Sequence, residues 1–582
     1  MKRIPTVPST LLRTCLAAGL MTAVPLLAAA PALACGGFFC SRVPVDQAAE
    51  KILFVKDGEE MVAHVQIQYT GPSEKFSWVV PVPTPPKLSV GSDQLFQTLR
   101  NTTRPQFQLN LRTEGTCKQN RGFFDGLVPT SPQAAGSAAE KSNSVEVVSR
   151  ADVGPYDTVV LKGDSVSVLK EWLAENGYDV PAKVDPLLEP YIKNKMYLLA
   201  LKLRKNHDAG DLQPIVMRYL SAKPMIPIQL TAVAATPDMD VQLWILGSHR
   251  AIPVNYPHVE INEALIDWVN QGQNYRSVVT TAMNEAGGRG FVTDYAGDSK
   301  AVPMDQLDPN RFNLESLRPL KEPLAFARAV NGFFPSNGAL VSFLGRYIAK
   351  PPAYRDVDDA TFYNQLESYE QAFAQAETTV NTAAAITELD ETLVKPLKDV
   401  KRLFMENPYL TGMFTTLSPD EMTADPMFDF NPQLPKVAVL RQAEGVRLCS
   451  RDVTEFEAPI RITTSKGLTF LVQQSQALQS GAGGTALPAA AMIQRTAATG
   501  APETLTDNSS KIAASLGKNR TVSVQPNGTG EARPVKEGFG CACQAPNTSR
   551  SAADSLKGAG EGLAYASVLL GFAAWRRWRK RR

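Results

Sequence analysis

The sequence is poor in the residues and motifs that mark the common enzyme classes. It has only four histidines, and none of its seven cysteines forms a C-x2-C pair, so a zinc site is not indicated. It contains no G-x-x-x-x-G-K-[ST] phosphate loop, no H-E-x-x-H zinc motif and no G-x-S-x-G nucleophile motif. We therefore expect no metal and no cofactor, and the pattern favours a binding or structural role over an enzymatic one.

A net charge of one sign is also missing. The 582 residues include 60 Lys and Arg against 58 Asp and Glu. Nine of these bases lie in residues 1–34 and 576–582, which leaves 51 bases against the 58 acids in the rest of the chain. Because this central part of the chain has a small net negative charge, its electrostatic field does not favour binding of nucleic acid. The composition, 44% hydrophobic and 20% charged, is that of a globular protein long enough for two or three cores.

The first 34 residues have the order of a secretory signal peptide. Lys2 and Arg3 precede an uncharged run over residues 15–30, and Ala32 and Ala34 supply the small side chains of an A-x-A cleavage site. We expect signal peptidase to cleave before Cys35 and the protein to be exported. One alternative is a retained anchor. Another is a lipid on Cys35, although Ala32 stands where a bacterial lipobox normally has a larger aliphatic residue.

Export favours disulfide bonds, because compartments outside the cytosol are oxidising. Six cysteines follow the expected cleavage site. We predict a local pair between Cys35 and Cys40, which enclose a short glycine-containing loop, and a long-range pair between Cys117 and Cys449. Other pairings stay open, because spacing alone does not determine connectivity.

The C-terminus has the order of a membrane anchor. Residues 562–575 are uncharged and largely apolar, and residues 576–582 contain six bases. Fourteen helical residues reach about 21 Å, less than the ~30 Å of a hydrocarbon core, so the span must begin near residue 559. We predict a single C-terminal transmembrane helix that binds the protein to the membrane, with the bases on the cytoplasmic side. An interfacial helix is the alternative.

Strand and helix patterns alternate without a regular βαβ rhythm, so we predict an α+β fold with a β-rich N-terminal meander. Polar and apolar residues alternate over residues 61–69, where His64 is expected to face solvent beside Gln66 and Gln68. A strand is expected at residues 228–234 and a helical segment near residues 360–406, with Pro396 as a break.

These patterns divide the chain into six parts. The flexible linker is assigned because its residues are mostly Ala, Gly, Ser and Thr, with few aromatics. The parts are a signal peptide (1–34), a β-rich part (35–128), an α+β part (145–345), a helical insertion with closing strands (346–473), a flexible linker (474–540), and a Cys motif with transmembrane helix and basic tail (541–582).

One loop cluster is a candidate ligand site. His249 and Arg250 follow a predicted strand, Asn255 and Tyr256 lie a few residues on, and Asp294 could add a carboxylate. An imidazole beside a guanidinium and a hydroxyl can bind an anionic group or assist proton transfer. The alternative is that these side chains only hold a proline-containing turn together. Two function classes follow: an envelope binding or structural protein, or an envelope hydrolase with its site near His249.

Five motifs occur in a family-specific order: residues 34–40, Phe76-Ser-Trp-Val-Val-Pro-Val-Pro83, Val153-Gly-Pro-Tyr-Asp157, and residues 172–178 and 409–423. Over residues 34–435 the chain resembles the exported bacterial domain of unknown function 2330. The resemblance implies export and the Cys35–Cys40 pair, and it implies no reaction.

The tail carries a second resemblance. Cys541 and Cys543, the short apolar run and the terminal arginines are similar to a MYXO-CTERM sorting signal. This resemblance implies cleavage near the cysteines by a dedicated membrane protease and display on the cell surface. Without cleavage, the protein is expected to stay anchored and face the periplasm.

Overall fold

A computed structural model of the chain describes residues 46–70, 76–118, 146–178, 180, 182–204, 212–334, 337–473, 485–517, 520–524 and 530–534. The chain divides into two units, Met1–Pro534 and Val535–Arg582, and the second lies wholly outside the described residues. The expected signal peptide, the Cys35–Cys40 pair, and Cys541 and Cys543 also lie outside the described residues.

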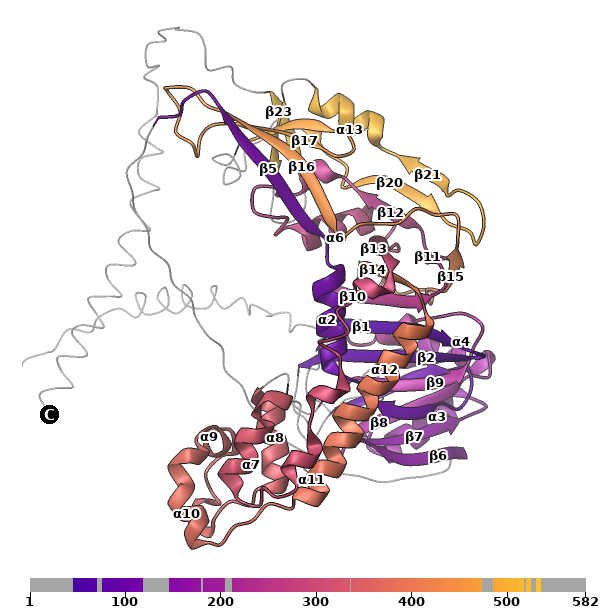
Figure 1. The fold of residues 1–582 in the computed structure, drawn as a ribbon. Helices are drawn as coiled ribbons and strands as arrows, with labels where there is room; N and C mark the ends of the chain where they lie inside the picture. The colour runs from indigo at the N-terminus through magenta and orange to yellow at the C-terminus, as the bar shows by residue number, and fades with distance from the viewer. Residues whose placement is uncertain are drawn as a thin grey trace, which may run out of the picture. The chain divides into compact units, whose positions relative to one another are not determined.

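Within the described part, seven strands form a central sheet in the order β13-β14-β10-β1-β2-β9-β4. Its outer strands are β13 (Val292–Asp298) at one edge, and β9 (Ile215–Leu220) and β4 (Lys87–Val90) at the other. Strands β1 (Asp46–Asp57) and β2 (Glu60–Thr70) form a hairpin, which turns at Gly58 with a φ of 61°. Strand β10 (Ala235–Gly247) runs parallel to β1 and antiparallel to β14 (Tyr409–Leu417). The hairpin thus lies in the interior of the sheet (Figure 1). Alternate side chains of the two strands are buried on opposite faces.

A second sheet packs on one face of the central sheet. It contains β3 (Ser77–Val82), β8 (Tyr197–Leu203), β7 (Tyr156–Lys162) and β6 (Glu146–Val153), in that order. One core cluster joins the two sheets, and a second lies between this sheet and the helices α3 (Val166–Glu175) and α4 (Asp185–Lys193). The β-rich N-terminal region of the predicted α+β fold is therefore confirmed.

A third sheet carries the predicted long-range disulfide. Strands β5 (Gln106–Glu114) and β16 (Leu440–Leu448) pair in parallel along their whole length. Cys117 and Cys449 follow the ends of these two strands and are bonded, with their Cα atoms 4.6 Å apart. The Cys117–Cys449 bridge is confirmed. The strand pairing explains it, because a parallel ladder carries the two chain segments side by side to the cysteines.

Part of the expected flexible linker is folded. Strand β20 (Ala490–Arg495) pairs with β12 (His258–Ile261) and with β21 (Glu503–Asp507), and helix α13 (Ser509–Leu516) follows. Its few apolar side chains are buried in a core shared with distant segments; they include Ala489, Ala490, Ile493, Ile512 and Leu516. The linker prediction is wrong over these residues, because composition did not reveal the partner strand.

The expected helical segment is present. It contains α9 (Asp359–Asn364), α10 (Glu370–Gln375), α11 (Thr382–Leu389) and α12 (Lys395–Glu406), and two helices outside the prediction, α7 (Pro323–Val330) and α8 (Asn337–Tyr347), precede it. These helices surround a core of their own, except that α12 packs mainly into the core of the central sheet. A π-helical turn, Asp390–Val394, separates α11 from α12, and Pro396 lies in the first turn of α12 (Figure 1).

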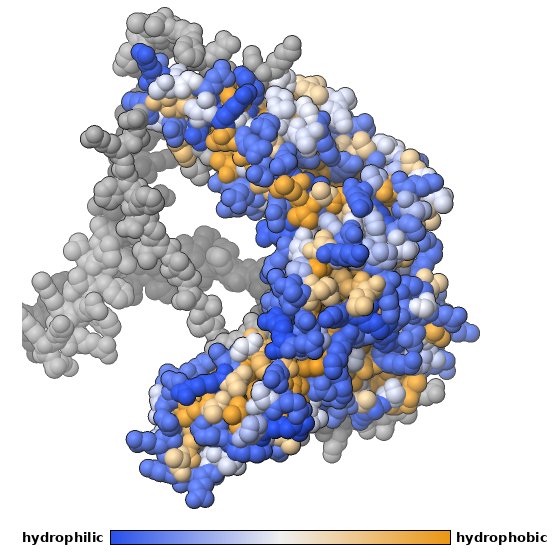
Figure 2. Space-filling view, in the orientation of Figure 1, coloured by the Kyte–Doolittle hydropathy of each residue, from blue (hydrophilic) through white to orange (hydrophobic). Residues whose placement is uncertain are grey.

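The fold class needs one correction. We expected a single C-terminal transmembrane helix, but no helix among the described residues is both long and apolar enough to cross a bilayer. Residues 562–575, where we placed it, lie outside the described residues. The transmembrane part of the prediction is not supported, and the fold class is α+β alone. Polar side chains cover most of the face seen in Figure 2, with apolar residues in smaller patches.

Two local predictions are also wrong. Residues 228–234 begin with a short helix, α5 (Ile228–Thr231), whose Ile228 and Leu230 reach two different cores. His64 is 1% exposed, because α2 (Asp93–Thr103) and α12 cover its face of the sheet. Burial lowers the pKa of the His64 imidazole to about 4, so this ring is neutral at pH 7.

On the opposite face of β1, Glu50 is a buried acid that makes the stability depend on pH. Its side chain is 4% exposed, and among the described residues its Oε2 atom has no hydrogen-bond partner. Burial raises the pKa of Glu50 from 4.5 to about 7. Because the folded state holds this proton more tightly than the unfolded state, the contribution is complete below pH 4.5 and is lost as the pH rises through about 7.

We predict that Glu50→Gln removes this loss. The variant should exceed the unaltered protein in free energy of unfolding at pH 8 by up to about 3 kcal/mol, and the gain should shrink toward pH 4.5. Urea unfolding at pH 5 and pH 8 measures both values. Glu59→Gln, an exposed change in the β1–β2 turn, is the control and should show no such trend. A gain for Glu50→Gln that is equal at both pH values would contradict the prediction.

Candidate functional site

Two adjoining cavities are lined by the central sheet and by segments near α2, β5 and α6 (Tyr275–Glu285). The inner cavity has a volume of about 230 Å³ and the outer one about 720 Å³. They share Arg104, Gln273 and Tyr275 in their walls. We call the two together the arginine cleft.

The end of α2 places two arginines on the cleft wall. Leu95, Phe96 and Leu99 bury one face of α2 against the central sheet, which leaves Arg100 and Arg104 exposed. The helix ends at Thr103 because Pro105 disfavours helical backbone at Arg104, which is extended. The Trp244 indole donates a hydrogen bond of 2.8 Å to the Thr103 hydroxyl and ties this end of the helix to β10.

The wall of the inner cavity carries two cations, Arg100 and Arg104. Within the described part of the chain neither forms an ion pair, whereas Arg276 in the same cavity does: its Nε lies 2.7 Å from Asp240 Oδ1. The two guanidinium groups therefore keep their forked donors available for a carboxylate or phosphate.

Asp294 supplies the most perturbed carboxyl group of the inner cavity. The register between β13 (Val292–Asp298) and β14 shifts between Thr293 and Tyr295, so Asp294 is the extra residue of a β-bulge. Bulges change the direction of a side chain and are frequent beside active sites. The Tyr275 hydroxyl donates a hydrogen bond to Asp294 Oδ1.

Burial governs the proton of Asp294. It raises the pKa of this carboxyl to about 7, against the opposing effects of the Tyr275 hydrogen bond and the charges of Arg441 and Arg104. Burial and the Asp294 charge raise the pKa of Tyr275 well above its ordinary value, so the phenol stays protonated. The inner cavity thus holds a carboxyl group that exchanges its proton near neutral pH.

Side-chain amides dominate the outer cavity. Six of them line it: Asn101, Gln106, Gln108, Asn270, Gln271 and Gln273. Beneath them Phe107 contacts Trp268 edge-on, with ring centroids 5.3 Å apart, and lies 5.6 Å from the Tyr275 ring. Amides can both donate and accept hydrogen bonds, which suits a ligand rich in hydroxyl groups.

Of the five predicted ligand residues, Asp294 lines the cleft and the other four do not. His249 is exposed in the turn between β10 and β11 (Arg250–Pro253), with Nδ1 at 2.9 Å from Ser248 Oγ. Arg250 is buried and donates to the Pro435 carbonyl at 2.9 Å and to Thr293 Oγ1 at 3.3 Å.

Asn255 and Tyr256 fasten a neighbouring loop. The Asn255 amide donates to the Asp425 carbonyl at 2.7 Å, and its oxygen accepts the Met427 N–H at 2.8 Å. The Tyr256 hydroxyl donates to the Ala424 carbonyl at 2.7 Å. These contacts correspond to the turn-holding alternative that the sequence left open.

Sequence reasoning missed the arginines and Tyr275. Arg100 and Arg104 are four residues apart, so a helical reading would have placed them on one face. Tyr275 and Asp294 had no comparable signal, because their contact depends on the bulge in β13. Within the described ranges, no three His, Cys, Asp or Glu side chains are grouped as metal ligands.

The model of a bacterial protein family, described as an uncharacterized protein conserved in bacteria (DUF2330), matches residues 29–328. The chain belongs to this family. The match is shorter than the resemblance over residues 34–435, but it includes Arg100, Arg104, Tyr275 and Asp294. No curated protein and no solved structure matches the chain.

Gly272 allows a test of the cleft floor. Its φ is 73°, and an added Cβ would lie 2.2 Å from Phe107 Cδ2. We predict that Gly272→Ala lowers the free energy of unfolding through backbone strain of about 1 kcal/mol and about 1–3 kcal/mol more from overpacking against Phe107. Denaturant unfolding measures the total.

Gly287→Ala is the matched control. Gly287 has a φ of 81°, and no described atom lies within 4 Å of its added Cβ. It should therefore show the backbone cost alone. Equal losses for the two variants would show that Phe107 does not hold the floor in place.

Proposed function

We propose that this chain is an exported bacterial protein whose arginine cleft binds an anionic glycan. The observation that carries the proposal is that Arg100 and Arg104, which have no ion-pair partner in the described part of the chain, lie beside a bank of side-chain amides. The guanidinium groups supply charge-assisted bonds to carboxylates, and the amides supply hydrogen bonds to sugar hydroxyls.

The size of the cleft agrees with such a ligand. Its outer cavity, about 720 Å³, lies in the upper part of the range for ligand sites and is the more open of the two. A ligand chain can therefore occupy several positions along the cleft. A small molecule would leave most of the amides unused.

Two observations support export. The N-terminus has the order of a signal peptide, and the Cys117–Cys449 bridge suits an oxidising compartment. The proposal places the protein in the periplasm or on the cell surface after cleavage by signal peptidase. For display on the cell surface, the proposal also requires a sorting protease that cleaves near Cys541 and Cys543.

We predict that the double change Arg100→Gln and Arg104→Gln weakens glycan binding at least about tenfold, because two charge-assisted contacts are lost. Polygalacturonate, a carboxylated polysaccharide, is the probe, and affinity electrophoresis or calorimetry measures the dissociation constant. Binding by the unaltered protein should weaken as salt is added.

Two controls accompany this measurement. Dextran, a neutral polysaccharide, should bind much more weakly than polygalacturonate. Arg318→Gln removes an exposed arginine paired with Glu315, away from the cleft, and should leave the affinity unchanged. Polygalacturonate binding that is the same in the double variant as in the unaltered protein would refute the proposal.

A second candidate function is hydrolysis in the same cleft, which the position and pKa of Asp294 favour. A carboxyl group that is still partly protonated near pH 7 can act as a general acid on a leaving group. Tyr275 would then orient Asp294 through its hydrogen bond. The alternative of a hydrolase centred on His249 has only Asp294 in common with this site.

For this candidate we predict that Asp294→Asn reduces the release of reducing ends from polygalacturonate at least about 100-fold, with binding changed by less than about twofold. Activity should fall as the pH rises through about 7, because the acid form is lost. Asp298→Asn, an exposed change on the same strand, should keep the activity. If the unaltered protein releases no reducing ends, this second function is excluded and binding alone is retained.

A further inference from the structure

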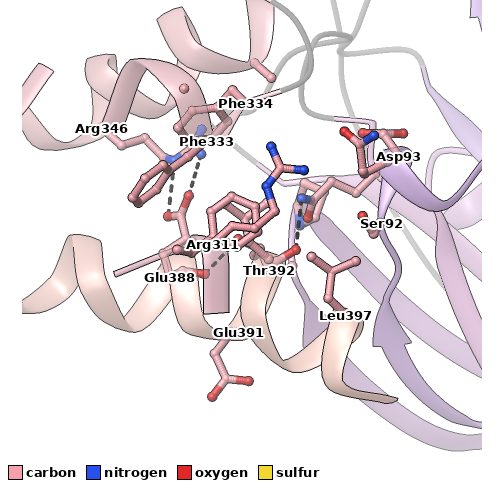
Figure 3. A pocket seen from close by; sticks show the side chains of 18 of the residues that line it. Ser92, Asp93, Arg311, Phe333, Phe334, Arg346, Glu388, Glu391, Thr392 and Leu397 are labelled. Atoms are coloured by element: carbon pink, nitrogen blue, oxygen red, sulfur yellow. Dashed lines mark hydrogen bonds and ion pairs between the residues drawn. The ribbon is translucent and has the colours of Figure 1, made fainter. Parts of the chain in front are cut away.

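A third cavity, separate from the arginine cleft, lies beside the helical segment. Its volume is about 230 Å³, and none of its lining residues lines the cleft. Figure 3 shows Phe333, Phe334 and Arg346 on one side of it, with Ser92 and Asp93 across from them. We call it the phenylalanine pocket, after Phe312, Phe333 and Phe334 in its wall.

Aromatic rings form the apolar part of the pocket. The centroids of Phe312 and Phe333 are 5.1 Å apart, with their planes at 80°. Phe334 lies 4.9 Å from Phe343, a buried ring of the helical core. Rings held in such tilted contacts present edges and faces to a further ring placed among them.

The Glu388 carboxylate in the wall is already neutralised. Its Oε1 lies 2.6 Å from Arg346 Nη2, and its Oε2 accepts a hydrogen bond of 2.6 Å from the Tyr347 hydroxyl. The side chains of Arg346 and Glu388 are only 19% and 23% exposed. Figure 3 shows this pair at one end of the pocket. Because both oxygens are engaged, Glu388 opposes an incoming anion only weakly.

Arg311 is a cation of the wall whose donors no acidic side chain of the described residues engages. Its Nη1 donates to the Gln306 carbonyl at 2.7 Å, and within the described part of the chain it has no acidic partner. The other charged groups of the wall are engaged: Arg204 with Asp152, Arg346 with Glu388, and Glu391 with Lys395. Asp93 accepts a hydrogen bond from the Gln66 amide.

The backbone gives an independent sign of a site. The π-helical turn Asp390–Val394 contributes Glu391, Thr392 and Leu393 to the wall. The Thr392 hydroxyl donates to the Glu388 carbonyl at 2.7 Å, so the turn is tied to the residue that holds Arg346. Single π turns within helices are rare and frequently occur at functional sites.

We propose that the phenylalanine pocket binds a small aromatic carboxylate, with its ring against Phe312, Phe333 and Phe334 and its carboxylate on Arg311. A cavity of about 150 Å³ is enough to hold benzene. The volume of about 230 Å³ therefore accepts one ring and a short acidic side chain, and it excludes a polymer of the kind proposed for the cleft.

The test is calorimetric titration of the purified protein with 3-phenylpropionate and with 3-phenylpropanol, its uncharged analogue. We expect the acid to bind at least tenfold more tightly than the alcohol. Arg311→Gln should weaken binding of the acid about tenfold and leave binding of the alcohol within twofold. Because the Arg311 side chain is exposed, the variant should fold normally, which its melting temperature checks.

Two control variants locate the binding. Arg318→Gln, an exposed arginine outside the pocket, should not change the affinity for the acid. The double change at Arg100 and Arg104 should not change it either, so failure of the glycan proposal is distinguishable from failure of this one. Equal affinity for acid and alcohol, an unchanged affinity in Arg311→Gln, or no saturable binding at 10 mM would each overturn the proposal.

Discussion

Burial of the β1–β2 hairpin on both faces is the constraint on which the rest of the structure depends. One face packs against the second sheet, and α2 and α12 cover the other. Strand β10 continues the sheet along the remaining edge of β1, and β14 and then β13 follow it. The inner cavity of the arginine cleft takes part of its wall from these three added strands.

Irregularities in otherwise regular elements provide the polar groups. Pro105 stops α2 where Arg100 and Arg104 reach the cleft, the bulge in β13 turns Asp294 toward Tyr275, and a π turn interrupts the α11–α12 helix beside the phenylalanine pocket. Each irregularity forgoes some regular backbone hydrogen bonding, and the neighbouring packed core holds it in place. The arginine cleft and the phenylalanine pocket differ in character: the cleft is open and rich in amides, and the pocket is compact and aromatic.

Sequence patterns performed well where the structure depends on near neighbours. The alternation over residues 61–69 predicted the strand β2, and the pattern near residues 360–406 predicted helices. The same reasoning failed for His64, since a strand next to polar glutamines looks half-exposed until α2 and α12 are known to cover it. It also failed for residues 485–517, which we expected to be a flexible linker. There, alanines and a few larger side chains are enough to form a folded segment, because β20 pairs with the edge of β12. In the candidate site only Asp294 was anticipated.

The sequence by itself determined the α+β composition, the signal-like N-terminus, the family and the positions of the cysteines available for pairing. These properties are read from residue types and short spacings, so they do not depend on how distant segments meet. Only the tertiary structure decided that Arg104, Tyr275 and Asp294 share one cleft, and that Phe312, Arg346 and Glu388 share another cavity. Their proximity results from the packing of sheets and helices whose residues lie up to hundreds of positions apart, and no local pattern encodes which buried face will meet which.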